Sequence, residues 1–257
     1  IGNWLGKLAH LDEFDHHVMI MCGMSAAFAA VFGTPMAAAV FAMEVVSVGV
    51  MYYAALLPCV IAAIIAAEFA TGMGIDPETF PVHSIPGLTV GTGLKMALIA
   101  VGCGILSILF CILLKTVGQL YTKYLKNPYI RIVVAAGVII LLTICLNTKD
   151  YMGAGSGLIA RAIEKGEARP LDFLWKMLLT ALTMRAGYRG GEIVPAFSIG
   201  ATFGCVAGGI LGFSPELAAA ASMVALFCGV TNCPITAMLI SFELFGFSGA
   251  AYYLIAI

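Results

Sequence analysis

SAAFAAVFGTPMAAAVFAME, from Ser25 to Glu44, decides the fold, because VALFCGVTNCPITAMLISFE, from Val224 to Glu243, repeats it 199 positions later. The aligned pairs include Ala26 with Ala225, Phe28 with Phe227, Pro35 with Pro234, Ala38 with Ala237, and Glu44 with Glu243. Matched alanines are common in apolar helices, so chance similarity is the alternative. Phenylalanine, proline and glutamate aligned together favour an internal repeat.

Each copy contains a break just before its proline. The break is Gly33-Thr34 ahead of Pro35 in the first copy and Asn232-Cys233 ahead of Pro234 in the second. Proline has no N–H and fits the first turn of a helix, so each copy predicts a helix, a short break and a second helix. Interrupted apolar segments at matching places in two halves indicate a transporter whose substrate binds near the bilayer midplane.

The composition extends this interpretation to the whole chain. The protein has 257 residues, of which 61% are hydrophobic and 11% charged, with a mean hydropathy of +1.03. A soluble domain is about 45–50% apolar and about 25% charged. Long apolar runs occupy residues 18–46, 51–71, 94–114, 130–146, 172–186, 193–213 and 217–257. Because backbone amides in lipid must bond within their own segment, we predict an all-α polytopic membrane protein.

Charge is distributed unevenly between the apolar runs. Four basic residues occur in a predicted loop at 115–131: Lys115, Lys123, Lys126 and Arg131. A second predicted loop, at 72–90, contains Asp76 and Glu78 and no lysine or arginine. Basic loops are retained on the cytoplasmic side, so the 115–131 loop is expected there and the 72–90 loop on the far side.

The sequence argues against several classes of site. The eight cysteines form no CxxC pair and lie in apolar surroundings, so we interpret them as small core residues. The pair His16-His17, beside three acidic residues, is interpreted as an interfacial helix cap rather than a metal site. No GxSxG or HExxH motif occurs, which leaves an intramembrane enzyme as a remote alternative. We expect no enzyme activity, metal, cofactor or nucleic-acid partner.

The stretch GGEIVP, from Gly190 to Pro195, predicts another broken helix start. Two glycines allow a ligand to approach the backbone closely, and Pro195 is tolerated in the first turn. Free amides at a helix start bind anions, with the positive end of the helix dipole behind them. We therefore predict an anion site formed by the backbone amides of four residues: Gly191, Glu192, Ile193 and Val194.

Glu192 is the unusual residue of this stretch, because an ionised carboxylate at membrane depth costs several kcal/mol. A protonated Glu192 can donate a hydrogen bond to an anion, whereas an ionised one repels it. Protonation and anion binding then strengthen each other, which is the basis of proton–anion coupling. Glu192 is our candidate for the proton-coupling residue. The alternative is a static ion pair with Arg185 or Arg189 at the helix end.

The two repeat glutamates, Glu44 and Glu243, are interpreted differently. Each ends the second helix of its copy, so we place it near a membrane surface, where a carboxylate can reach water or a helix terminus. This favours a structural role over a place in the ion pathway. Glu68, near the end of AALLPCVIAAIIAAEF, is interpreted as an interfacial residue.

Together these blocks resemble the CLC family of chloride channels and proton-coupled anion exchangers. The two repeats resemble its helix–proline–helix stretches, GGEIVP falls where the family has its G-x-F-x-P anion-site motif, and YMGAGSGLI, from Tyr151 to Ile159, resembles the glycine-rich stretch before it. Their order and spacing agree across essentially the whole chain. The resemblance implies a CLC-type fold with inverted repeats and broken helices, in an integral membrane protein of the bacterial inner membrane.

The resemblance also implies how the chain is divided. Residues 1–257 correspond to one transmembrane domain that is incomplete at both ends. Residues 1–126 match the end of the first repeat half and the dimer-facing helices, and residues 127–257 match most of the second half. The family's selectivity loop, external gating glutamate and central tyrosine would lie outside this sequence. A second copy of the chain is the expected partner, and helices 54–67 and 94–114 are rich in the small residues that allow close packing.

The branch of the family is indicated by Glu192. Chloride-selective members usually have an apolar residue there, whereas an acid resembles the fluoride/proton exchanger branch. Val45 stands where proton-coupled chloride exchangers have an intracellular proton-relay glutamate. Val194 departs from the branch, which tends to have a hydroxyl residue at that position. The resemblance implies proton-coupled fluoride export, with inorganic anion and protons as ligands. The alternative is a chloride channel or a chloride/proton exchanger of the same fold.

Overall fold

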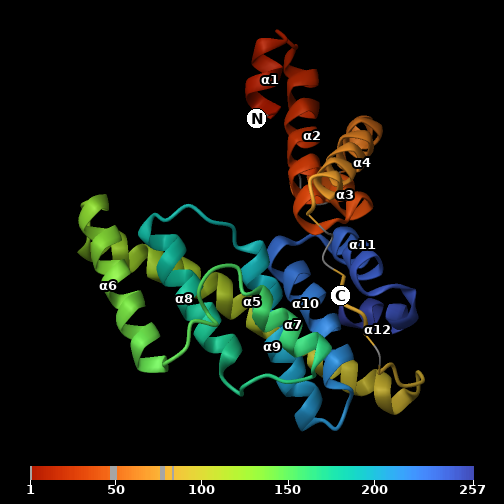
Figure 1. Cartoon of the computed structure of the whole chain (residues 1–257), viewed down its shortest axis with the longest axis vertical. Coiled ribbons are helices and arrows are strands. Elements are labelled where there is room, and N and C mark those ends of the chain that lie inside the picture. Colours follow the sequence, from red (N-terminus) through yellow and green to blue (C-terminus); the bar gives the residue numbers. More distant parts are fainter. Residues whose placement is uncertain (1, 47–50, 76–78, 83) are drawn as a thin grey trace. The chain divides into compact units, whose positions relative to one another are not determined.

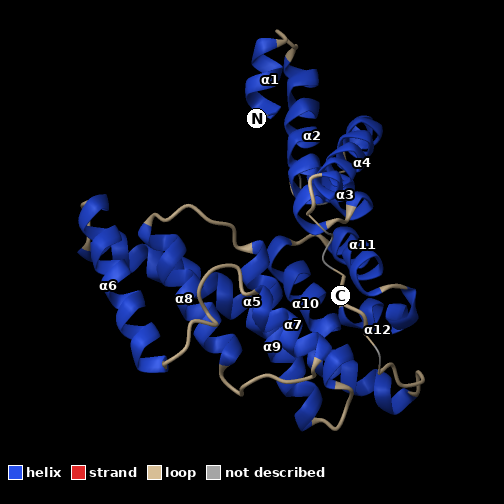
Figure 2. Ribbon diagram, viewed as in Figure 1, coloured by secondary structure: helices blue, strands red, loops and turns tan. Residues whose placement is uncertain are grey.

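The computed structural model describes residues 2–46, 51–75, 79–82 and 84–257. Asp76 and Glu78, which entered the interpretation of the 72–90 stretch, lie outside the described residues. The described part is helical and contains no β-strand, which confirms the all-α prediction (Figures 1 and 2). Its helices are α1 (Gly2–Leu8), α2 (Glu13–Phe32), α3 (Pro35–Glu44), η1 (Tyr53–Ala55), α4 (Leu56–Gly72), α5 (Val90–Tyr124), α6 (Pro128–Leu146), α7 (Ser156–Glu164), α8 (Asp172–Ala186), α9 (Ile193–Ile210), α10 (Pro215–Thr231), α11 (Pro234–Phe245), η2 (Phe247–Gly249) and α12 (Ala250–Ala256).

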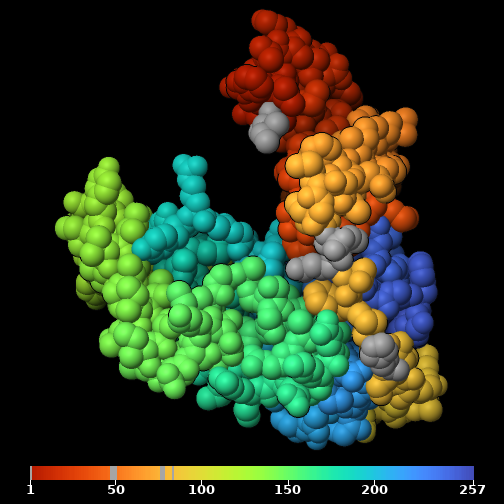
Figure 3. Space-filling view, viewed as in Figure 1, coloured from red at the N-terminus to blue at the C-terminus, as the bar shows by residue number. Residues whose placement is uncertain are grey.

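Five helical segments of the described part are long and apolar enough to cross a membrane. They are α2, η1 with α4, α5, α6 and α9. The side chains of α6 are mostly exposed, among them Val133, Leu141 and Ile144, and this helix forms a yellow-green surface in the space-filling view (Figure 3). Exposed apolar faces on long helices are stable when lipid covers them, so the chain is an integral membrane protein.

The prediction of a loop over residues 115–131 was wrong about the length of the loop. α5 begins at a capping box formed by Thr89 and Thr92 and continues to Tyr124, so only Leu125–Asn127 separate it from α6. The stretch after Leu114 contains no proline before Pro128, and charge alone does not end a helix. Lys115 and Lys123 therefore lie on α5. Lys123 is in its last turn, where a cation interacts favourably with the helix dipole.

The chain forms two compact units. Unit 1 contains residues 1–81 and 231–250, and unit 2 contains residues 82–230 and 251–257. Unit 1 therefore holds both breaks of the repeat, and unit 2 holds α9 with the GGEIVP stretch. These units are defined by contacts, so they do not test the repeat halves expected at residues 1–126 and 127–257. That division of the chain stays a prediction.

Unit 1 confirms both breaks. Thr34 and Cys233 have the same backbone angles, φ −118° and ψ 75°, and each is followed by a proline at the first helical position. The residue before each is left-handed, with φ 66° at Gly33 and φ 57° at Asn232. A left-handed residue ends the preceding helix, and glycine and asparagine are the residues that adopt this conformation at least cost. The two copies therefore match in backbone geometry as well as in sequence.

The core of unit 1 joins α2, α3 and α4. Its buried residues are Met21, Ala39, Ala42, Met43, Ala55 and Cys59. The alanines of the repeat leave little side chain between helices, so methionines fill the remaining space. Cys59 and Cys103 are buried as predicted, but Cys111 and Cys145 are exposed, which corrects the interpretation of all eight cysteines as core residues.

The core of unit 2 surrounds α9. Buried residues from α5, α8, α9 and α10 meet there: Leu106, Phe110, Leu114, Val117, Met177, Ala181, Ala196, Ile199 and Leu226. α9 also carries glycines that lie directly against α10. A methyl group on Gly200 would overlap the carbonyl oxygen of Ser222, and one on Gly204 would overlap that of Ala218. These glycines let the two backbones approach closely and so fix the axis of α9.

This close packing makes a matched pair of glycine substitutions informative. Gly204→Ala should lower the free energy of unfolding by about 1–3 kcal/mol, because the new methyl group would overlap the backbone of α10. Gly209→Ala is the control on the same helix, since a methyl group there would have no atom within 4 Å. Thermal unfolding of the full-length protein in detergent, followed by circular dichroism, measures both. Equal midpoints for the two variants would contradict the packing of α9 on α10.

Candidate functional site

Two of the broken helix starts are capped by carboxylates. Glu44, at the end of α3, reaches the start of α11. Its Oε1 accepts a hydrogen bond from the amide of Ile235 at 3.1 Å, and its Oε2 accepts from the amide and the hydroxyl of Thr236 at 2.8 and 2.7 Å. The Glu44 side chain is buried. The amides at the start of α11 are therefore satisfied by the last residue of α3.

The start of α3 is capped in the reciprocal way. Glu243, near the end of α11, accepts hydrogen bonds from the amides of Met36 and Ala37 at 3.0 and 2.9 Å. The two copies of the repeat thus exchange carboxylates, which is the contact expected of inverted elements. The structural interpretation of Glu44 and Glu243 is confirmed: each carboxylate reaches a helix terminus, and the terminus belongs to the other copy.

The start of α9 is different, because no carboxylate caps it. Glu192 is the residue before the helix, and its side chain makes no hydrogen bond to the helix start. In the part of the chain that the structure describes, no acceptor is paired with the amides of Ile193 and Val194. Pro195 has no N–H, and the first bond of the helix runs from the amide of Ala196 to the carbonyl of Glu192 at 3.0 Å. α9 therefore begins with two free donors.

The residues predicted to bind the anion lie together at this start. Gly191 is exposed, and Glu192, Ile193 and Val194 are half-buried. A methyl group on Gly190 or Gly191 would have no atom within 4 Å, so there is open space beside these two glycines. Free amides, a helix dipole and open space form a site that can hold a small anion.

Glu192 lies near α5 and close enough to the Cys111 side chain to interact with it electrostatically. Neither Arg185 nor Arg189 pairs with it: within the described ranges, the ion pair found at 4.0 Å or less is Arg161 with Asp150. A third arginine, Arg131, donates a hydrogen bond from its Nε to the carbonyl of Ala186, at the end of α8, at 2.9 Å. The carboxylate of Glu192 therefore has no ion-pair partner among the described residues.

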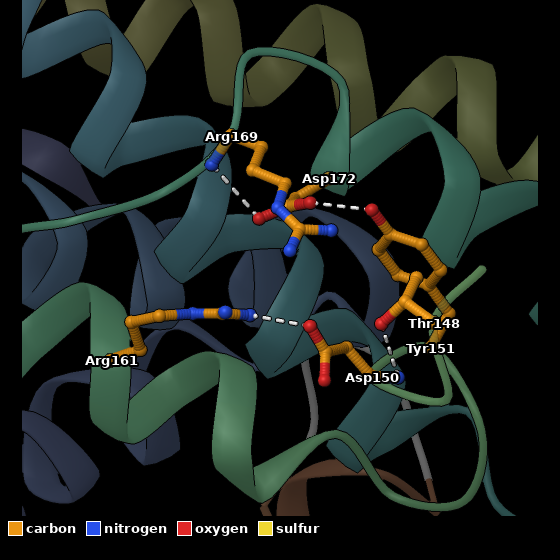
Figure 4. A network of polar contacts seen from close by, with 6 residues as sticks. All are labelled: Thr148, Asp150, Tyr151, Arg161, Arg169 and Asp172. Atoms are coloured by element: carbon orange, nitrogen blue, oxygen red, sulfur yellow. Dashed lines mark hydrogen bonds and ion pairs between the residues drawn. The ribbon is translucent and has the colours of Figure 1, made fainter. Parts of the chain in front are cut away.

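A second polar cluster was not predicted. It joins the stretch after α6 to the start of α8 (Figure 4). The Tyr151 hydroxyl donates to Asp172 at 2.6 Å, the amide of Arg169 donates to the same carboxylate at 2.9 Å, and Arg161 pairs with Asp150 at 3.1 Å. Asp172 is buried, in an apolar helix. The signal for this cluster in the sequence is the pair of charged residues Asp172 and Lys176, one turn apart in that helix.

The cluster also sets the protonation of its members. Burial would raise the pKa of Asp150, but hydrogen bonds from Arg161 and Thr148 outweigh it and hold that pKa below its ordinary value. Burial, together with the hydrogen bond to Asp172, raises the pKa of Tyr151 to about 12. Tyr151 is therefore a hydrogen-bond donor at neutral pH, and the cluster is a fixed structural element under ordinary conditions.

A groove of about 590 Å³ lies elsewhere on unit 2. It is lined by Arg161 and Arg169, by the segment 166–170, and by residues 205–210 in the second half of α9. Glu192 and the free amides are at the other end of that helix, so the groove is not part of the candidate anion site.

Comparison with known proteins identifies the fold. The sequence profile of the family described as "Voltage gated chloride channel" matches residues 1–257. The crystal structure of a CLC-type fluoride/proton antiporter superposes with a TM-score of 0.93 at 32% identity, over 98% of this chain and 64% of that one. The structure of a eukaryotic CLC transporter, at 21% identity, gives a TM-score of 0.73 over 97% of this chain and 44% of that one, and shares the fold.

Two curated relatives differ in the activity that their names give. A chloride/fluoride channel protein from Pseudomonas syringae pv. tomato is 33% identical over 96% of this chain and 56% of its own length. The H(+)/Cl(-) exchange transporter ClcA from Vibrio cholerae is 27% identical over 95% of this chain and 55% of its own length. The chain thus spans about half the length of the curated relatives it matches.

The reciprocal caps lead to a stability prediction. Glu44→Ala leaves the amides of Ile235 and Thr236 without acceptors, which should cost about 1–3 kcal/mol of unfolding free energy. Glu68→Ala, which removes an exposed carboxylate from α4, should change it by less than about 0.5 kcal/mol. Urea or thermal unfolding of the full-length protein in detergent compares the two. A Glu44→Ala protein as stable as the control would show that the cap contributes nothing.

Proposed function

Because the chain belongs to the voltage gated chloride channel family, we propose that it forms the anion-conducting part of a membrane protein that exports fluoride in exchange for protons. The observation that carries the proposal is the start of α9, where the amides of Ile193 and Val194 have no protein acceptor and Glu192 stands beside them. The activity is transport, in which the substrate undergoes no covalent change.

The site holds an anion through dipoles rather than through a cation in contact with it. Two amides and the positive end of the α9 dipole replace part of the anion's hydration shell. No lysine or arginine of the described part forms an ion pair at Glu192. Conduction requires binding that is favourable but weak enough for release, and a dipolar site meets both needs.

Glu192 supplies the coupling in this proposal. When the carboxyl group is protonated, it can donate a hydrogen bond to the anion beside it. When it is ionised, its negative charge opposes the anion. Anion binding therefore favours proton binding and proton binding favours anion binding, by the same factor, which is the requirement for coupled movement.

Fluoride is preferred over chloride as the substrate on two grounds. The relatives at 32–33% identity are a CLC-type fluoride/proton antiporter and a chloride/fluoride channel protein. The acid at position 192 also resembles the fluoride branch. A chloride/proton exchanger is the second candidate, since ClcA from Vibrio cholerae is also a relative. Val45 stands where chloride/proton exchangers of the family have a proton-relay glutamate. A valine side chain cannot carry a proton, so this position argues against the coupling that such exchangers use.

We further propose a homodimer in a bacterial plasma membrane. The relatives named above include bacterial membrane transporters. α4 exposes a row of large apolar side chains, Leu57, Ile61, Ile65 and Phe69, which a second copy can cover. Chemical crosslinking of the full-length protein in native membranes tests the oligomeric state.

Flux measurements test the coupling. The full-length protein in liposomes should show fluoride efflux accompanied by proton influx, with chloride efflux much slower. Glu192→Gln should reduce proton flux by about tenfold or more while the anion still moves, because glutamine can donate a hydrogen bond but has no group that takes up and releases a proton near neutral pH. Glu68→Gln, at an exposed site on α4, should transport as the wild type does.

Two results would contradict the proposal in different ways. Chloride moving as fast as fluoride would return the protein to the general anion transporters of the family. Proton coupling unchanged in Glu192→Gln would remove Glu192 from the proton pathway, whichever anion is carried.

A further inference from the structure

Lys176 is a buried cation in the middle of an apolar helix. Its side chain is 1% exposed, in the second turn of α8. Its ammonium group donates to the carbonyl oxygens of Tyr151 and Gly153 at 3.1 and 2.7 Å. In the described ranges of the chain, no carboxylate lies within 4.0 Å of Nζ. A buried ammonium held by backbone carbonyls alone is unusual, because an unpaired charge is costly to remove from water.

The neighbouring acids are already engaged. Asp172, one turn earlier on α8, accepts from Tyr151 and from the amide of Arg169, and Asp150 pairs with Arg161 (Figure 4). The side chain of Arg169 also interacts with the Tyr151 hydroxyl, beside Asp172. Each carboxylate of the cluster thus has its own arginine nearby. Among the described residues of the cluster, Lys176 is the cation with no carboxylate as its partner.

This charge stands directly beside α9. Gly155 has φ +91°, and a methyl group on it would meet Oγ of Ser198 at 2.8 Å and Nζ of Lys176 at 3.1 Å. The ammonium and the Ser198 hydroxyl therefore line the same small space. Ser198 belongs to α9 and donates to the carbonyl of Pro195 at 3.0 Å. At a rise of about 1.5 Å per residue, it lies about 6–8 Å along the helix from the amides of Val194 and Ile193.

We propose that Lys176 determines anion affinity: its buried ammonium group lies behind the amino terminus of α9 and strengthens binding of the transported anion there. The inference rests on the proposed function, because it takes the anion site to be at that terminus. Lys176 does not touch an anion held at the amides of Ile193 and Val194, since its ammonium lies beside Ser198, about 6–8 Å further along the helix, and gives two of its three donors to the carbonyls of Tyr151 and Gly153. It adds attraction over a distance without forming a contact that would slow release.

The simpler role for Lys176 is to tie the glycine-rich stretch at 151–155 to α8. The two roles separate in Lys176→Gln, because the glutamine amide can still donate to both carbonyls but carries no charge. A purely structural lysine predicts unchanged anion affinity in this variant. If the charge of Lys176 attracts the anion, Lys176→Gln should bind the anion more weakly while the stretch at 151–155 is still held to α8.

Isothermal titration of the purified full-length protein with fluoride and with chloride measures the effect. Lys176→Gln should weaken binding of whichever anion the wild type binds by about tenfold, the effect expected of one charge about 10 Å away at an effective dielectric constant near 20. Lys176→Arg, which keeps the charge, should remain within about twofold of the wild type. The matched control is Lys95→Gln. Lys95 is a half-buried residue of α5, and its ammonium group also donates to a backbone carbonyl, that of Gly212 at 3.0 Å.

The outcomes distinguish the two proposals. Wild-type affinity in Lys176→Gln, with an unchanged or lowered unfolding temperature, would overturn the role of Lys176 and leave the proposed function intact. A wild-type protein that binds neither anion would overturn both. If Lys176→Gln does not fold, Lys176→Arg carries the test, since folded protein with more than tenfold weaker binding would contradict a role for charge.

Discussion

The first amides of a helix have no partner within that helix, and the described structure depends on how these amides are satisfied. At α3 and α11 the solution is internal. Glu243 accepts from the start of α3, and Glu44 accepts from the start of α11. Each copy of the repeat therefore stabilises the other, and both helix starts are closed to any external anion. At α9 no side chain of the described residues caps the helix, which is why we propose that the amides of Ile193 and Val194 bind the anion.

The three carboxylates involved show how position decides the role of one residue type. Glu44 ends α3 and Glu243 lies in the last turn of α11, and each accepts hydrogen bonds from amides at the start of the other helix, so both act as caps in the fold. Glu192 precedes its helix and makes no hydrogen bond to the helix start, so its charge acts on whatever occupies the space in front of it. Behind that helix start, Lys176 is buried beside Ser198, and its ammonium group is paired with no carboxylate of the described residues. In the function proposed for the protein, Glu192 stands before the helix start and takes up the coupled proton, and Lys176 attracts the anion from behind it.

Sequence reasoning reached the features that have local causes. The breaks at Gly33 and Asn232 were predictable, because a left-handed residue followed closely by proline has a local signature in the sequence. The start of α9 was predictable for the same reason. The partners of Glu44 and Glu243 were not, since about 200 residues separate each carboxylate from its amides and no pattern encodes that pairing. Lys176 was missed because its partners are backbone carbonyls, which any sequence supplies. The 115–131 loop was predicted from charge, but helix continuity depends on helix propensity and breakers, so α5 continued to Tyr124.

Amide resonances test the central claim most directly. The full-length protein in nanodiscs, labelled with nitrogen-15 at isoleucine, valine, methionine, alanine and threonine, would be titrated with fluoride and then with chloride. The account predicts saturable shifts for the amides of Ile193 and Val194 with at least one anion. The amides of Met36, Ala37, Ile235 and Thr236, which already bond to carboxylates, should not move. Shifts at those four amides with none at Ile193 and Val194 would contradict the assignment of α9 as the open helix start.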